Sequence, residues 1–152
     1  MLRTVALLTP PFASLTYAVP EWLAGFAWCP GLRVAVPLGR GMLRIGVVLG
    51  DGSPLPEGVT ARPMLWPLEK EPLLPSGHME MVRQLALRQA VTPGQILAMV
   101  LPAGLRVTQM RLRTMEGQGK AQIRLLKDLP KLPAEVLSAL GEAWMRGGAE
   151  LL

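Results

Sequence analysis

Residues 31–50 constrain the fold most, because this segment contains two short apolar runs joined by a glycine-rich connection. The runs cover residues 32–38 and 43–49, and Gly-Arg-Gly-Met at 39–42 separates them. Glycine readily adopts the positive φ angles that tight hairpin turns require. The segment therefore predicts two antiparallel strands joined by a basic turn, where an anion could bind.

The first of these strands has a period of two. Alternate positions form two sets, which are Val34, Val36 and Leu38 on one side and Arg33, Ala35 and Pro37 on the other. Such alternation is typical of a strand with one buried and one exposed face. We therefore expect this strand to be half-buried.

The first 67 residues predict a β-rich region. Strands are expected at residues 2–8 and 15–19, and an edge strand within 59–67, where Pro63 excludes a central position. Short strands separated by Gly- and Pro-rich turns are typical of a small barrel or sandwich. The prediction is an α+β fold that begins with a small β-barrel-like domain.

Residues 77–101 predict two helices. Ser76 is the expected N-cap of the first, which covers about 77–90 and has an apolar face of Met79, Val82, Leu85 and Ala86. Thr92-Pro93 has the pattern of an N-cap followed by proline in the first turn, and Pro102 ends the second helix.

The remaining residues predict a second, smaller region. We expect a strand at 106–113, a linker or turn at 116–119 and an amphipathic helix at 133–146 that stops at Gly147-Gly148; residues 120–128 fit helix or strand. The expected domains are 1–105 and 106–152. The second is short for an independent domain, so a fragment of a larger protein is one interpretation.

The chain is basic, with 152 residues, a formal charge of +5 and a sequence pI of about 10.1. A basic surface favours polyanion binding, most often nucleic acid; the alternative is ordinary solvated charge. Arg40 in the predicted turn and Arg44 in the second strand are candidates for phosphate contacts.

Catalytic motifs are scarce. The chain has one Cys, Cys29, and one His, His78, so an internal disulfide, a Cys/His metal site and an acyl-transfer triad are all poorly supported. Gly-Gln-Gly-Lys at 117–120 lacks the spacing of a phosphate-binding loop. The apolar run at 5–8 is cut by Pro10, and nothing approaches a membrane span. We therefore expect a cytoplasmic, non-catalytic chain without cofactors.

Three motifs then occur in a specific order. They are Thr-Tyr-Ala-Val-Pro-Glu at 16–21, Pro-Gly-Leu-Arg-Val-Ala-Val-Pro-Leu-Gly-Arg at 30–40 and Ile-Gly-Val-Val at 45–48. This order resembles the N-terminal region of primosomal protein N′, the PriA family of replication-restart DNA helicases. The likeness covers about residues 1–106; beyond it, the chain resembles more weakly the beginning of that family's winged-helix domain.

The resemblance implies a DNA-binding module that receives the 3′ end of the nascent leading strand at a fork. The family's 3′-end pocket corresponds to Leu15, Thr16, Gly39 and Arg62, and Tyr17 lies beside them as a candidate for base stacking or for the core. Only Gly39 is identical: Leu15 stands where the family has Phe, and Thr16 where it has Asp.

The resemblance also implies partners and cofactors. Forked DNA with a 3′ end is the expected ligand, and a single-strand-binding protein and other primosome proteins are possible partners. ATP, magnesium and zinc are expected only in the rest of a full-length helicase. Two other functions stay open on fold and charge: a protein-interaction module on a small β-barrel, and an RNA-binding barrel.

Overall fold

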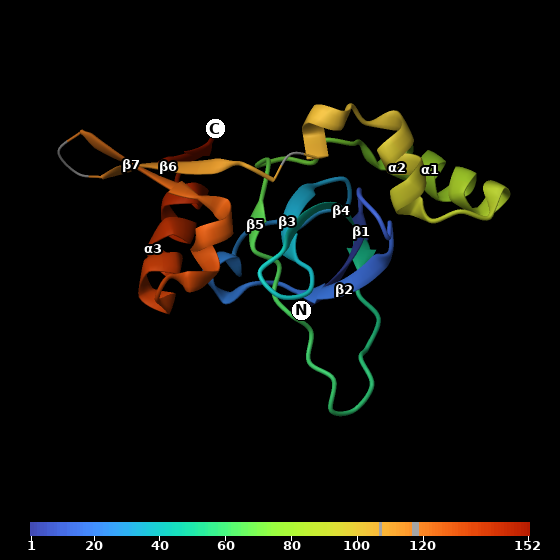
Figure 1. The fold of residues 1–152 in the computed structure, drawn as a ribbon, viewed down its shortest axis with the longest axis horizontal. Helices are drawn as coiled ribbons and strands as arrows, with labels where there is room; N and C mark the ends of the chain where they lie inside the picture. The colour runs from blue at the N-terminus through green and yellow to red at the C-terminus, as the bar shows by residue number, and fades with distance from the viewer. Residues whose placement is uncertain (107, 117–118) are drawn as a thin grey trace.

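The computed structural model describes residues 1–106, 108–116 and 119–152. A five-stranded antiparallel sheet forms its N-terminal part, with the strand order β2-β1-β4-β3-β5 (Figure 1). Its strands are β1 (Leu2–Leu7), β2 (Ser14–Ala18), β3 (Arg33–Pro37), β4 (Leu43–Asp51) and β5 (Trp66–Pro67). Helices and a second sheet complete an α+β fold, which confirms the predicted class.

The predicted hairpin is present as β3 and β4. The two strands pair in antiparallel register, and the amide of Leu38 donates to the carbonyl oxygen of Met42 at 3.0 Å across the turn. Gly39 and Gly41 both have a φ angle of +65°, which only glycine adopts without strain. These two glycines are therefore what allows the connection to be so short.

The expected alternation along β3 is wrong. Every residue from Arg33 to Val36 is buried. Arg33 tolerates burial because its guanidinium forms an ion pair with Glu69 and donates from Nη1 to the carbonyl oxygen of Leu105 at 2.7 Å. The strand is thus covered on both faces, one of them by segments distant in sequence.

The predicted barrel-like sheet is strongly curled (Figure 1), but it does not close into a barrel among the described residues. In the described part of the chain, an isolated parallel bridge between Ala18 and Pro63 links β2 to the segment that precedes β5. The amide of Ala18 donates to Arg62 and that of Met64 to Ala18, both at 2.9 Å. Pro20 lacks the amide hydrogen for the next bond, so the bridge does not extend into a ladder. Of the expected edge strand at 59–67, only β5 forms.

Two helices lie at one side of the curled sheet, α1 (Ser76–Gln89) and α2 (Pro93–Val100) (Figure 1). Thr92 caps α2 as predicted, in a capping box with Gln95. The N-cap predicted for α1 is wrong: Pro75 occupies that position, without a side-chain cap, and Ser76 is already helical. The expected apolar face of α1 is buried at Met79, Val82 and Ala86 and half-buried at Leu85.

A three-stranded sheet with the order β7-β6-β8 follows, built from β6 (Arg111–Glu116), β7 (Lys120–Leu125) and β8 (Ala149–Leu151). The strand predicted at 106–113 begins later than expected, and its residue 107 lies outside the described residues. Residues 117 and 118 of the predicted turn also lie outside them. The ambiguous segment 120–128 is a strand that runs into a 3₁₀ helix.

The predicted last helix is α3 (Ala134–Met145). The short 3₁₀ helices are η1 (Glu21–Leu23), η2 (Ala103–Arg106) and η3 (Leu126–Lys131). Helix α3 packs closely on η1, because Gly141 lies so near the carbonyl oxygen of Trp22 that a β-carbon would not fit. The indole rings of Trp66 and Trp144 meet edge to face, with centroids 5.9 Å apart.

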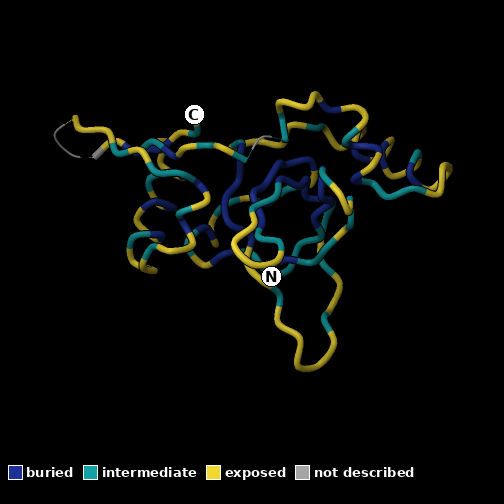
Figure 2. Tube along the Cα trace, viewed as in Figure 1, coloured by how far each residue is buried: buried dark blue, intermediate teal, exposed yellow. Residues whose placement is uncertain are grey.

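Buried residues from both parts of the chain form one apolar cluster (Figure 2). The contact between Trp66 and Trp144 joins β5 to α3 within it. The division at residue 105 stays a prediction.

Candidate functional site

A surface pocket of about 460 Å³ lies between β2, the β3–β4 turn and the loop that leads to β5. We call it the terminal pocket. Its wall contains all five residues that the family resemblance brought forward, namely Leu15, Thr16, Tyr17, Gly39 and Arg62. Three separate segments of the chain, at residues 15–17, 39 and 62, thus converge on one hollow.

Arg62 lies at the rim of the terminal pocket. Its Nη1 donates to the carbonyl oxygen of Gly39 at 2.7 Å, and the residue is exposed. A guanidinium carries five N–H donors in a planar fork, so this bond leaves further donors for an anion. The bond to Gly39 fixes the cation beside the turn.

Tyr17 forms part of the pocket wall rather than an open stacking platform. It is only 4% exposed, and its hydroxyl donates to the carbonyl oxygen of Pro37 at 2.8 Å. Burial raises the pKa of the Tyr17 hydroxyl, and the nearby charge of Arg62 opposes that rise. The hydroxyl is therefore a neutral donor whose titration depends on Arg62.

Leu15 and Thr16 are both half-buried on β2, where they pair with Val5 and Thr4 of β1. The Thr16 methyl group lies close to Gly52, whose missing side chain leaves room for it. The pocket thus has an apolar contact at Leu15 and a hydroxyl at Thr16, and neither an aromatic ring nor a carboxylate stands at these positions.

Sequence reasoning missed the outer wall of the pocket. It is formed by the loop after β4, which contributes Leu55, Val59, Thr60 and Ala61. Val59 is an exposed large apolar residue, at 54%. The Gly and Pro content of this segment predicted a loop, but no local pattern shows that it folds back beside β2 (Figure 1).

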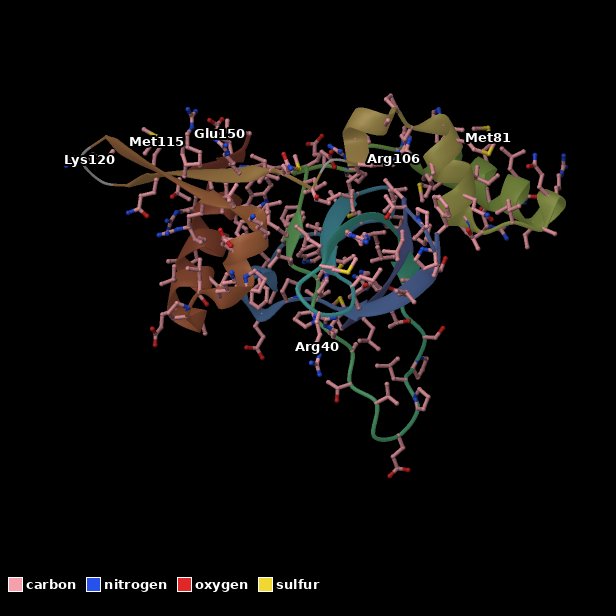
Figure 3. The ribbon with its side chains drawn as sticks, in the orientation of Figure 1. Arg40, Met81, Arg106, Met115, Lys120 and Glu150 are labelled. Atoms are coloured by element: carbon pink, nitrogen blue, oxygen red, sulfur yellow. The ribbon has the colours of Figure 1, made fainter. Side chains whose placement is uncertain are left out.

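The two arginines predicted to contact phosphate do not line the terminal pocket. Arg40 is exposed at the tip of the β3–β4 turn and points away from the body of the protein (Figure 3). Arg44 is half-buried on β4 and lines another hollow, together with Arg111 and Lys127. Both arginines flank the pocket rather than enter it.

The described residues contain no group of three or more His, Cys, Asp or Glu side chains placed to hold a metal ion. None of the helices that the structure describes is both long and apolar enough to cross a membrane.

Comparison with known proteins adds one match. The family model of the PriA 3′ DNA-binding domain matches residues 4–102, which is more than half of the chain. No curated protein matches the sequence. Every residue that lines the terminal pocket falls within the matched segment. The chain therefore belongs to the PriA 3′ DNA-binding domain family.

Proposed function

We propose that the terminal pocket is the site at which this chain binds the 3′ end of the nascent leading strand at a replication fork. Binding of a DNA 3′ end in replication restart follows from membership of the family. The observation that carries the assignment to this pocket is the convergence of Leu15, Thr16, Tyr17, Gly39 and Arg62 on one hollow.

Each wall residue has a physical role in this proposal. Arg62 donates to a phosphate oxygen of the last nucleotides, and the absence of a side chain at Gly39 lets the sugar approach the backbone. Thr16 exchanges a hydrogen bond with the terminal 3′-hydroxyl. Leu15 packs on the last base with a smaller contact than a ring provides, and ring stacking contributes about 1–3 kcal/mol per base.

Charge supports DNA as the ligand. The chain carries +5, and no Asp or Glu is among the described residues that line the terminal pocket. Arg40 at the tip of the turn and Arg44 on β4 are our candidates for contacts to neighbouring phosphates. Each neutralised phosphate lowers the logarithm of the binding constant by about 0.7 to 0.9 per decade of salt.

The proposal is tested with matched forks that have or lack a free leading-strand 3′ end, with single-stranded DNA as a third ligand. Fluorescence anisotropy should show tighter binding to the fork with the 3′ end, and a 3′-phosphate in place of the hydroxyl should weaken it. Equal affinity for all three ligands contradicts 3′-end recognition. Preference for RNA of the same sequence, or salt-insensitive binding to a protein alone, would favour the alternative functions.

Arg62→Ala tests the placement. It should weaken binding and reduce the salt slope by about 0.7 to 0.9, and Arg40→Ala should reduce the slope in the same way. Arg88→Ala on the exposed face of α1 removes the same charge far from the pocket and is the matched control. If Arg62→Ala behaves like Arg88→Ala, the pocket is misplaced.

We infer from the family that this chain is the DNA-binding part of a cytoplasmic replication-restart helicase. Helicase activity, with its ATP, magnesium and zinc, is assigned to other domains of such a protein. Residues 106–152 are proposed as part of its winged-helix-like region. A single-strand-binding protein and other primosome proteins are the proposed protein partners, and co-purification of full-length protein with them would test this.

A further inference from the structure

Two further hollows adjoin the terminal pocket in sequence, each sharing wall residues with its neighbour. The middle hollow, of about 350 Å³, shares Pro37 and Arg62 with the terminal pocket. The distal hollow, of about 560 Å³, shares four residues with the middle one, namely Gly41, Met42, Leu43 and Lys127. The three hollows therefore lie in a row, from β2 past the β3–β4 turn to β6 and β7, and we call this row of adjoining hollows the groove.

The groove is lined by cations along its whole length. Arg62 belongs to its first two hollows, Lys127 and Lys131 of η3 to the middle, and Arg44, Arg111 and Lys127 to the distal one. Among the described residues, none of the lining side chains is acidic. One of these cations has a counter-charge nearby, since the half-buried Asp128 carboxylate lies 3.5 Å from the Lys131 ammonium. Such a one-sign surface attracts a polyanion.

The floor of the groove differs from its rim. The middle hollow is largely apolar, with Met64, Leu65 and Pro130 among its walls, whereas Lys127 and Lys131 are exposed at its edge. Single-stranded nucleic acid has this combination, because its bases have apolar faces and its backbone is charged. An acidic peptide would form ion pairs with the cations, but its charged side chains would not pack on the apolar floor.

We propose that the DNA strand whose 3′ end occupies the terminal pocket runs on through the middle and distal hollows, where Lys127 and Arg111 contact its phosphates. The inference rests on the proposed function for the position of the 3′ end. To that function the inference adds a path for the strand and two contact residues, Lys127 and Arg111, which lie outside the segment matched by the family model.

The path makes binding depend on strand length. Lys127 and Arg111 do not line the terminal pocket, so a thymidine dinucleotide seated in that pocket should contact only Arg62 of the three. A strand of about twelve thymidines should contact all three. The double variant Lys127→Ala/Arg111→Ala should therefore leave dinucleotide affinity unchanged. For the longer strand, we expect a roughly sixtyfold loss at about 50 mM salt and a salt slope smaller by about 1.4.

The matched control is Arg88→Ala/Lys120→Ala, which removes the same charge from exposed positions that do not line the groove. Lys127 and Arg111 are exposed, and circular dichroism should show unchanged folding of the double variant. The variant Lys127→Gln/Arg111→Gln, which keeps most of the side-chain length, should show the same loss and excludes a packing effect.

Two results would overturn the strand path. One is equal affinity of the double variant and the control for the longer strand, and the other is an equal loss for the dinucleotide and the longer strand. A third probe, decaglutamate, tests for an acidic peptide as the true ligand. If the double variant no longer binds decaglutamate but still binds DNA with wild-type affinity, the groove binds acidic protein segments and the strand path is wrong.

The same measurements distinguish a failure of the strand path from a failure of the terminal pocket. A long strand blocked by a 3′-phosphate still covers Lys127 and Arg111, so the double variant should weaken its binding as strongly as that of the unblocked strand. Loss of this effect contradicts the path. Absence of any difference between blocked and unblocked strands in the wild-type chain contradicts the terminal pocket instead.

Discussion

The guanidinium of Arg33 in β3 is held by the carboxylate of Glu69, 36 residues further along the chain. The Arg33 Nε donates to the Oε1 atom at 2.5 Å, and both side chains are largely shielded from water, at 11% and 22% exposure. A further bond from Arg33 reaches the carbonyl oxygen of Leu105 at 2.7 Å. One cation thus ties the five-stranded sheet to the loop after β5 and to η2.

Removing the carboxylate should therefore destabilise the fold. Glu69→Gln leaves a shielded guanidinium without its counter-charge, and we expect the free energy of unfolding to fall by about 3 kcal/mol. Urea denaturation measures this loss. The exposed Glu57→Gln in the loop after β4 is the control and should leave the urea midpoint nearly unchanged. A similar small effect of Glu69→Gln would mean that the pair contributes little.

The hydroxyl of Tyr17 should report on the charge of Arg62. Burial raises the pKa of Tyr17 above the usual value of about 10, and the Arg62 charge lowers it. Arg62→Ala should therefore raise the pKa further. Tyr17 is the only tyrosine in the chain, so the tyrosinate absorbance near 295 nm, followed with pH, measures its titration alone. A lower pKa in the variant would contradict the position of Arg62.

The carboxyl of Glu80 should titrate far into the acid range. Side-chain hydrogen bonds from Arg83 and Gln84 lower its pKa from 4.5 to about 2. Because the pKa is lower in the folded chain, the stabilisation is present above about pH 4.5 and is lost as the pH falls toward 2. Carboxyl chemical shifts measured by NMR should show this pKa, and Arg83→Met should return it toward 4.5.

Two glycine-to-alanine substitutions should have opposite effects. A β-carbon at Gly141 would lie 1.8 Å from the carbonyl oxygen of Trp22, whereas one at Gly77 in α1 has no heavy atom within 4 Å. We expect Gly141→Ala to lower the free energy of unfolding by about 2 kcal/mol or more, and Gly77→Ala to raise it by about 0.5 kcal/mol. Thermal denaturation of both variants provides the comparison, and equal shifts would contradict the close packing of α3 on η1.

Thr16→Asp should sharpen the preference for a 3′-hydroxyl. A carboxylate accepts a hydrogen bond from the hydroxyl and repels an additional phosphate, whereas threonine does only the first. Competition between strands that end in 3′-hydroxyl and 3′-phosphate measures this preference. Thr4→Asp on the neighbouring strand is a control for charge on this sheet, and an unchanged preference in Thr16→Asp would place Thr16 outside the site.

Local patterns predicted the elements that depend on few residues. The glycines at 39 and 41 indicated the β3–β4 turn, and Thr92-Pro93 indicated the capped start of α2. The family motifs pointed to Leu15, Thr16, Gly39 and Arg62, which all line the terminal pocket, because motif order records a spatial arrangement that periodicity alone does not.

The features that the sequence could not predict depend on contacts between residues far apart in the chain. The burial of Arg33 depends on Glu69 and Leu105, and the alternation of β3 contains no sign of either. Strand β8 has only three residues and follows two glycines, so its own sequence does not predict a strand. It forms because it pairs with the open edge of β6. The groove likewise depends on η3 lying beside the β3–β4 turn, which no local pattern specifies.

The contact between Trp66 and Trp144 has a practical consequence for how this protein is divided. Trp66 lies inside the segment that the family model recognises, and Trp144 lies outside it. A chain ended at residue 102 would keep the recognised segment but uncover the Trp66 indole, and newly exposed apolar surface promotes aggregation. The boundary of sequence similarity is therefore a poor place to cut, because it separates Trp66 from the indole ring that packs against it.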